Sequence, residues 1–266
     1  METRFFDTSQ GKLSYSINGS GPVILFIHGF PFNKSIWYPY MEKISNFTTL
    51  AIDLPGHGDS DIYGKPDLDD WSKKIYEFLN FLSINQITII GHSMGGYVAC
   101  DFAELFPNNV SGLGLFHSSA RADTEEKKQN RDRIIQTIKE DHKKYIYNSV
   151  PSLFAKENVL KYKSEIDKLI NLSQNMEKQA LINAQTAMRD REGHLELLTN
   201  ANFPFLFIIG KQDPNQPYET LLAQASLTKI SFILMLEHCG HMGFVEDFNR
   251  TYWAIESFAK LCYAGV

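Results

Sequence analysis

The sequence has 266 residues, which suits one sizeable α/β domain better than two small ones. Hydrophobic residues make up 43% and charged residues 21%, a balance that lets a large core form without metals or disulfides. The formal net charge of −5 argues against a surface that binds nucleic acid or an anionic membrane.

The chain begins with a segment, Phe5–Ile17, that predicts an antiparallel hairpin at a sheet edge, and short apolar runs then alternate with helical stretches. The runs that we interpret as buried strands are Pro22–Ile27, Thr48–Ile52, Gln86–Ile90, Val110–Phe116, Phe203–Ile209 and Ile230–Leu236. The predicted helices are Lys34–Ile44, Leu68–Leu82, Gly95–Phe106, Tyr218–Ala225 and Phe244–Leu261. Runs that are apolar on both faces and separated by helices indicate an α/β fold with a mostly parallel sheet covered on both sides.

One long region breaks this alternation. From about residue 121 to residue 200 there is no strand-like run, and the composition becomes helical and charged. Asp123 and Glu126 fit the start of a helix with a capping box, and Asp123–Lys144 is dense in both signs of charge. Because the sheet pattern resumes afterwards, we interpret residues 121–200 as a helical insertion in a single domain whose core is residues 1–120 and 201–266.

The sharpest chemical signal is Gly91-His92-Ser93-Met94-Gly95, which matches the pattern G-x-S-x-G. A predicted buried strand precedes it and a predicted helix follows at once. Such a strand-to-helix turn holds the serine in a cramped backbone conformation and exposes its Oγ above the sheet. Ser93 is therefore the candidate nucleophile; the alternative is a glycine-rich packing turn with an incidental serine.

A serine hydroxyl needs a base within hydrogen-bond reach, and the base needs an acid that orients it. His241 follows the last predicted strand, and Gly240 before it gives the loop freedom to aim the imidazole; His238 is the competitor. Asp213 lies in the turn after the preceding strand, and the order serine, aspartate, histidine is the one this topology requires. The alternatives for the acid are that Asp213 only caps its own turn, or that Asp123 takes the role.

An oxyanion hole needs two backbone donors. We expect one to be the N–H of Met94, directly after the nucleophile at a helix N-terminus. The other should come from the loop His28-Gly-Phe-Pro31, where Phe30 is the candidate because Pro31 has no N–H. His28 and His57 are interpreted as structural histidines of their turns.

These features together resemble the α/β-hydrolase superfamily, especially its small carboxylesterase and enol-lactonase-like members. The motifs that carry the resemblance are His28-Gly29, Asp53-Leu-Pro-Gly-His-Gly-Asp-Ser60, Gly91-His-Ser-Met-Gly-Gly96, Gly210-x-x-Asp213 and Gly240-His241. The resemblance covers nearly the whole chain and implies an α/β-hydrolase fold with a triad of Ser93, Asp213 and His241. It also implies oxyanion-hole roles for Phe30 and Met94, and a variable cap in residues 121–200. Haloalkane dehalogenases and epoxide hydrolases of this fold carry an aspartate at the elbow, which separates them from this chain.

A substrate pocket is expected between the sheet and the helical insertion. The residues predicted to line it are Trp37, Tyr97, Phe116 and Met242, joined by Phe30, Phe32, Tyr145, Tyr147, Phe154 and Met188. Aromatic and methionine side chains suit an apolar acyl or aryl group, although such residues more often simply fill the core. Arg121 could bind a substrate carboxylate or simply be solvated.

No cofactor and no metal are expected, because the histidines are scattered and form no His-x-His or His-Glu-x-x-His pattern. The three cysteines show no ligand spacing and suit a reducing compartment. The first residues lack a signal-peptide pattern, and no apolar run approaches the ~20 residues that a membrane span needs. We therefore expect a cytoplasmic protein with a small-molecule substrate, no nucleic-acid partner and no membrane span; a homodimer remains open.

The predicted function is that of a serine hydrolase. It would cleave a carboxylic ester, thioester or lactone of a small apolar or aromatic substrate through an acyl-enzyme. Two alternatives remain. The same site could serve a cofactor-free perhydrolase or a lyase-type enzyme, or the fold could be a ligand receptor with slow turnover.

Overall fold

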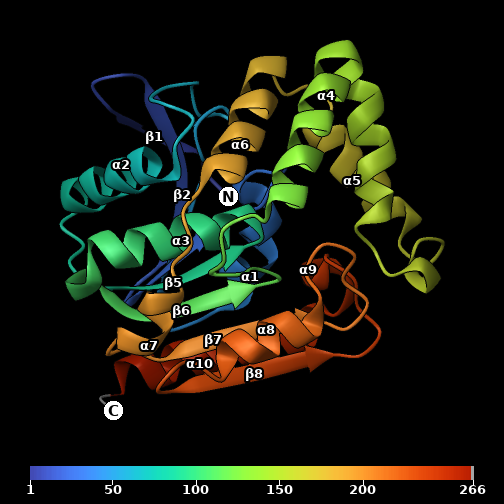
Figure 1. Ribbon diagram of the computed structural model, residues 1–266. Coiled ribbons are helices and arrows are strands. Elements are labelled where there is room, and N and C mark those ends of the chain that lie inside the picture. The colour runs from blue at the N-terminus through green and yellow to red at the C-terminus, as the bar shows by residue number, and fades with distance from the viewer. Residues whose placement is uncertain (265–266) are drawn as a thin grey trace.

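The computed structural model describes residues 1–264 and is built on one eight-stranded sheet (Figure 1). The strands are β1 (Arg4–Asp7), β2 (Lys12–Gly19), β3 (Val23–Ile27), β4 (Thr48–Ile52), β5 (Ile87–His92), β6 (Val110–Phe116), β7 (Phe205–Gly210) and β8 (Ser231–Leu236). Their order across the sheet is β1-β2-β4-β3-β5-β6-β7-β8. From β4 onward all neighbours are parallel, whereas β1 pairs with β2 and β2 with β4 in antiparallel fashion. The predicted edge hairpin and mostly parallel sheet are thus confirmed.

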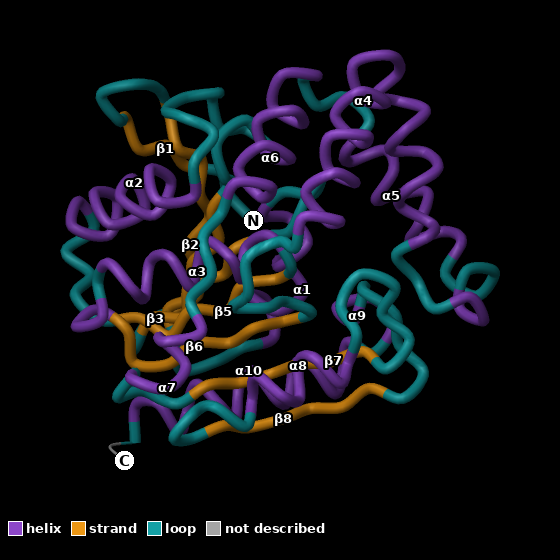
Figure 2. The backbone as a smooth tube through the Cα atoms, in the orientation of Figure 1, coloured by secondary structure: helices purple, strands orange, loops and turns teal. Residues whose placement is uncertain are grey.

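Helices cover both faces of the sheet (Figures 1 and 2). They are α1 (Tyr38–Lys43), α2 (Leu68–Phe81), α3 (Met94–Leu105), α4 (Glu125–Ser152), α5 (Lys163–Ser173), α6 (Lys178–Asp190), α7 (Leu195–Asn200), α8 (Tyr218–Ala225), α9 (Gly243–Glu246) and α10 (Phe248–Tyr263). Alternate residues of one strand point to opposite faces: Leu25 and Ile27 pack with the buried residues of α2 and α3, whereas Ile24 and Phe26 pack with those of α1 and α10. Two apolar cores therefore lie back to back across the sheet.

The last predicted strand is less buried than its apolar sequence suggests. Phe232 and Ile233 of β8 are 38% and 48% exposed, so the expectation of a fully buried strand is wrong there. The reason is topological: β8 is the sheet edge and pairs on one side only. An apolar run alone does not distinguish an edge strand from a central one.

Between β6 and β7 the chain forms α4, α5, α6 and α7, and the first three stand beyond the sheet in both ribbon views (Figures 1 and 2). Helix α4 packs against α5 and α6 and is broken at Asp141, where φ is −149° and ψ is 90°. The N-cap of α4 is Thr124, whose side chain accepts a hydrogen bond from Lys127 N–H. The predicted capping role of Asp123 is therefore wrong, because that carboxylate binds arginines instead.

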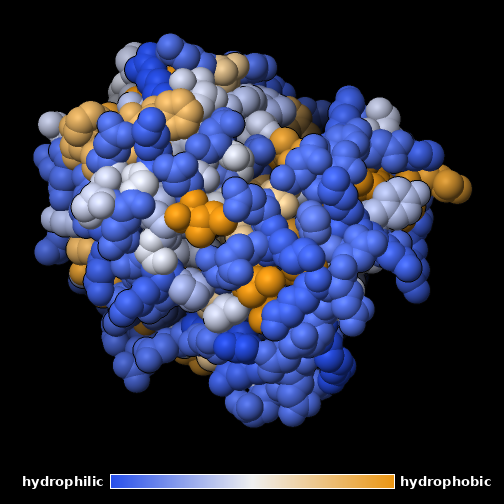
Figure 3. All heavy atoms as spheres, turned by 90° about the horizontal axis from the view of Figure 1, so that it is seen from above, coloured by the Kyte–Doolittle hydropathy of each residue, from blue (hydrophilic) through white to orange (hydrophobic). Residues whose placement is uncertain are grey.

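Seen from above, the side that carries α4, α5 and α6 is mostly hydrophilic, with a few scattered apolar side chains (Figure 3). Across residues 1–264, the helices lack the combination of length and apolar sequence that a membrane span requires.

Candidate active site

Ser93 occupies the turn between β5 and α3 in a backbone conformation that side chains rarely adopt, with φ 50° and ψ −115°. The turn is tight because its glycines touch neighbouring backbone. A Cβ at Gly91 would collide with the carbonyl of Gly95, and a Cβ at Gly95 would collide with that of Ile27. Strained residues of this kind concentrate at functional sites because the surrounding structure must hold them in place. The local geometry is that expected of a nucleophile elbow.

His241 and Asp213 meet at the ends of neighbouring strands. His241, on the loop after β8, lies with Nδ1 2.7 Å from Oδ2 of Asp213, on the loop after β7. The other carboxylate oxygen accepts hydrogen bonds from the N–H groups of Asn215 and Gln216, at 2.8 and 3.1 Å. Burial disfavours the charged carboxylate, but electrostatic attraction to the His241 imidazole and the hydrogen bonds from His117 and His241 outweigh it and lower the pKa of Asp213 well below its usual range. The carboxylate is thus held ionised.

A second histidine supports the same carboxylate and was not foreseen from the sequence. His117 Nδ1 lies 3.4 Å from Oδ2 of Asp213, and its Nε2 is 3.2 Å from the N–H of Gly243. Burial lowers the pKa of His117 despite the neighbouring Asp213, so its imidazole is neutral. The N–H of Gly210 also donates to His117 Nδ1, at 3.2 Å, so each ring nitrogen faces a backbone donor and Nδ1 faces the Asp213 carboxylate as well. His117 follows β6 directly, and no motif marks it.

The loop that carries His241 is fixed to the helical insertion. The N–H of His241 donates to the carbonyl of Leu153 at 2.7 Å, and His92 Nε2 is 2.9 Å from the carbonyl of His241. A Cβ at Gly240 would collide with the N–H of Ala155. Gly240 is thus explained by close approach to the end of α4, not by freedom to aim the imidazole.

Glu246 joins the two segments. Its Oε2 accepts from the N–H of Ala155 and from Asn158 Nδ2, at 2.9 and 2.8 Å. Its Oε1 accepts from the N–H groups of Gly240 and Met242, at 3.0 and 3.2 Å. One buried carboxylate therefore bridges the insertion and the His241 loop. Sequence reasoning missed it, since a lone glutamate in a short helix carries no pattern.

The two proposed oxyanion donors flank the elbow. Met94 is the first residue of α3, and Phe30 follows Gly29 in the loop after β3. A Cβ at Gly29 would lie 3.1 Å from the Cβ of Ser93, so this loop passes directly beside the nucleophile. Within residues 1–264, neither the Phe30 N–H nor the Met94 N–H donates a hydrogen bond. Both are free for a ligand, and their role toward an oxyanion stays a prediction.

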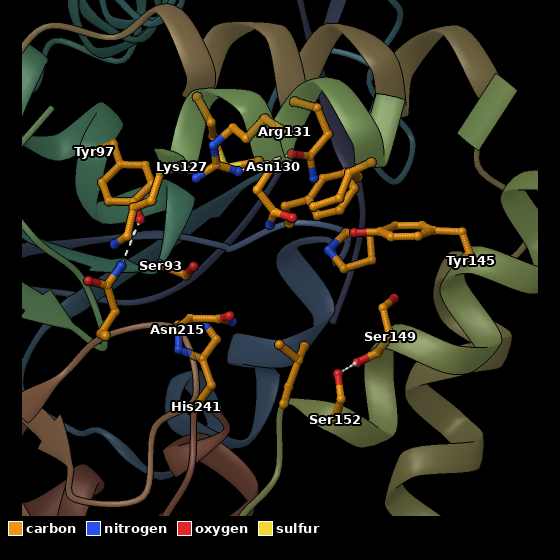
Figure 4. Close-up of a pocket in the computed structure, with 17 residues that line it drawn as sticks. Ser93, Tyr97, Lys127, Asn130, Arg131, Tyr145, Ser149, Ser152, Asn215 and His241 are labelled. Carbon is orange, nitrogen blue, oxygen red and sulfur yellow. Dashed lines mark hydrogen bonds between the residues drawn. The ribbon is translucent and has the colours of Figure 1, made fainter. Parts of the chain in front are cut away.

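Ser93 and His241 share a cavity of about 310 Å³ beneath α4 (Figure 4). It is lined by Phe30, Pro31, Ser93, Tyr97, Lys127, Asn130, Arg131, Ile134, Tyr145, Ser149, Ser152, Leu153, Gln185, Met188, Asn215, Gln216 and His241. Ser93 and His241 lie on one side of it, and Lys127, Asn130 and Arg131 face it from α4 (Figure 4).

The expected lining residues divide into two groups. Tyr97 lines the cavity, as do Phe30, Tyr145 and Met188. Trp37, Phe116 and Met242, by contrast, are fully buried in the core on the α1 and α10 face of the sheet and do not line it. Phe32 and Phe154 are also core residues, and Tyr147 points to solvent. Nearness to a motif in sequence does not fix the face of the sheet on which a side chain lies.

The competing candidates lie elsewhere. His238 is exposed, pairs with Glu157 at 3.0 Å and does not line the cavity. Asp123 pairs with Arg131 and Arg191 and does not contact His241. Arg121 is exposed and does not line the cavity.

The remaining histidine motifs are structural. His28 Nε2 accepts from the N–H of Leu54 at 3.0 Å, and Nδ1 of His57 is 3.1 Å from the carbonyl of Pro55. Among the residues that the structure describes, no group of three or more His, Cys, Asp or Glu could hold a metal ion.

Comparison with known proteins gives consistent results. The family model for the alpha/beta hydrolase fold matches residues 22–248. A pimeloyl-[acyl-carrier protein] methyl ester esterase of Pseudoalteromonas atlantica is 29% identical over 243 residues, which is 86% of this chain and 92% of that protein. An esterase structure from Thermogutta terrifontis superposes with a TM-score of 0.92 at 25% identity, covering 99% of this chain and 100% of that one.

Some relatives match over a shorter stretch. An uncharacterized protein of Mycobacterium bovis is 41% identical over 116 residues, which is 41% of this chain and 33% of that protein. This chain thus spans about a third of the length of the first curated relatives that it matches.

Proposed function

The chain belongs to the alpha/beta hydrolase family, and on that premise we propose that it hydrolyses carboxylic esters through an acyl-enzyme on Ser93. The observation that carries the proposal is that Ser93, in a strained turn, and His241, bound through Nδ1 to Asp213, face one cavity. The relatives named as esterases support the choice of ester as the bond that is cleaved.

The reaction follows from these positions. His241 Nε2 takes the proton of Ser93 as its Oγ attacks the ester carbonyl carbon. Asp213 stabilises the imidazolium, and the N–H groups of Phe30 and Met94 bind the oxyanion of the tetrahedral intermediate. The intermediate collapses, the carbon–oxygen bond to the alcohol breaks, and His241 gives its proton to the leaving alcohol.

Water then repeats the sequence on the acyl-enzyme. His241 removes a proton from the water as it attacks the acyl carbon, and afterwards returns the proton to Ser93 Oγ. The carboxylic acid leaves and the enzyme is regenerated. Thioesters and lactones fit the same steps, with a thiol or the ring's own alcohol as leaving group.

The proposal is tested by labelling with a fluorophosphonate, which reacts with activated serines, followed by peptide mapping. We expect a single adduct on Ser93 and loss of p-nitrophenyl ester turnover in Ser93→Ala by about 10³-fold or more. Ser226→Ala, an exposed serine at the end of α8, is the matched control and should behave as wild type. Folded wild-type protein that takes no label and turns over no ester would overturn the proposal in favour of a ligand receptor.

A further inference from the structure

The cavity has an unusual balance of charge. Lys127 and Arg131 line it, one helical turn apart on α4, whereas no aspartate or glutamate does. The chain as a whole carries a net charge of −5. The cationic lining is therefore a local feature that opposes the average charge of the protein.

Arg131 is held in a fixed position. Its Nε donates to Oδ2 of Asp123, and its Nη1 donates to Gln185 Oε1 at 3.0 Å. Its Nη2 has no protein acceptor in residues 1–264 and is not among the buried polar atoms that lack a partner. The NH₂ group at Nη2 of a preorganised guanidinium thus remains accessible to a ligand.

Asp123 does not cancel the positive charge beside the cavity, because its carboxylate is shared by two arginines. Its Oδ1 lies 2.8 Å from Nη2 of Arg191, whose guanidinium stacks over the ring of Tyr97 at 3.8 Å. Burial disfavours the Asp123 carboxylate, but Arg131 and Arg191 outweigh this and lower its pKa. One carboxylate between two guanidinium groups leaves one positive charge in excess beside the cavity.

Lys127 adds a second charge. Within residues 1–264 no acidic side chain lies within salt-bridge distance of its ammonium group, whereas its neighbour Lys128 pairs with Glu125 at 3.1 Å. Both cations of the cavity come from α4, across from the Ser93 and His241 side (Figure 4).

We propose that the substrate of this ester hydrolase carries a second functional group, a carboxylate, which Arg131 and Lys127 bind while Ser93 attacks the ester carbonyl. The inference rests on the proposed function and narrows it to anionic esters. Asp123 and Gln185 already occupy two of the donor positions of Arg131, so a single carboxylate suits what remains better than a phosphate dianion. A cavity of about 310 Å³ is at the small end of ligand pockets and favours a short dicarboxylic acid monoester or a small hydroxy-acid ester.

The test compares matched charged and neutral esters. In the first pair, mono-4-nitrophenyl glutarate has a carboxylate on its acyl group and 4-nitrophenyl pentanoate has none. In the second pair, acetoxyacetate has a carboxylate on its alcohol group and ethyl acetate has none. We expect kcat/KM to favour the anionic member of one pair by about tenfold or more, and to lose this preference as salt is added. The pair that shows the preference identifies the side of the ester that carries the carboxylate.

Variants assign the effect to residues. Lys127→Gln should reduce the preference several-fold by lowering kcat/KM for the anionic ester more than for its neutral partner. Lys128→Gln, on the same turn but outside the cavity, should leave the preference as in wild type. Arg131→Gln should reduce it further, but because Arg131 also supports Asp123, Lys127→Gln is the decisive variant. Neutral esters turned over as fast as anionic ones, with Ser93 still required, would overturn this inference and leave the proposed function standing.

If no ester is turned over, the proposed function is contradicted, and a binding measurement then tests the carboxylate site by itself. Glutarate binding to the wild-type protein, weakened by Lys127→Gln and not by Lys128→Gln, would support the carboxylate site. Absence of glutarate binding would overturn it.

Discussion

Replacement of Glu246 by glutamine should both destabilise the protein and impair the site. Four nitrogen donors face this buried carboxylate, three backbone N–H groups and Asn158 Nδ2, and the thiol of Cys239 lies 3.7 Å from Oε1. A carboxylate accepts from all four, whereas glutamine has one carbonyl oxygen and turns an NH₂ group toward two of the donors.

The size of the effect follows from that arrangement. At least two buried donors lose their acceptor, and each costs about 1–3 kcal/mol, so the free energy of unfolding should fall by about 2–6 kcal/mol. Two of the donors, on Gly240 and Met242, flank His241, so esterase kcat should fall as well. Urea unfolding and ester turnover measure the two effects.

The control is Glu237→Gln, on the loop between β8 and His241. Glu237 is exposed and pairs with exposed Lys211 at 2.7 Å, an ion pair that water and salt screen, so its loss should leave the free energy of unfolding nearly unchanged. If Glu246→Gln unfolded at the same urea concentration as Glu237→Gln, with unchanged kcat, Glu246 would not bridge the two segments in solution.

Two further predictions concern strain and pH. Ser93→Gly should abolish turnover and raise the free energy of unfolding by about 1–3 kcal/mol, because glycine adopts a φ of 50° without strain; urea unfolding that shows no gain would contradict this. Burial lowers the pKa of His57 from 6.5 to about 4, so below pH 6.5 the unfolded chain binds more protons than the folded one. The contribution of neutral His57 to the free energy of unfolding is complete above pH 6.5. As the pH falls toward 4, this contribution is lost at up to about 1.4 kcal/mol per pH unit. His57→Gln should show a shallower fall in stability than wild type between these values, and identical slopes in urea unfolding would refute the assignment.

The parts of the fold that could be predicted are those that the chain encodes locally. The sequence around Ser93 shows its strand, its tight turn and its helix within a few residues, because a nucleophile elbow needs glycine at fixed positions around the serine. Asp213 and His241 were predicted from their positions just after two strands, and the structure places their side chains 2.7 Å apart. Parallel strands bring their carboxyl ends to one edge, so these side chains converge once the topology is known.

The pocket could not be predicted in the same way. Phe116 and His117 are adjacent in sequence, yet Phe116 packs in the core while His117 contacts the Asp213 carboxylate. Lys127 and Arg131 appeared only as part of a charged helix, which usually faces solvent. The packing of α4 over Ser93 is a tertiary contact between segments far apart in the sequence, so no local pattern predicts it.

The insertion covers the cavity and also fixes the loop that carries His241, the proposed base. Helix α4 presents Lys127 and Arg131 to the cavity before its break at Asp141, and after it the chain continues to Leu153, whose carbonyl fixes the N–H of His241. Displacing the end of α4 would therefore disturb the loop of His241, because both this bond and the Glu246 bridge join that loop to the end of α4. The segment before Asp141 makes neither of these bonds. If the proposed function holds, substitutions early in α4 should change substrate selectivity, while the end of α4 must keep the backbone geometry that orients His241.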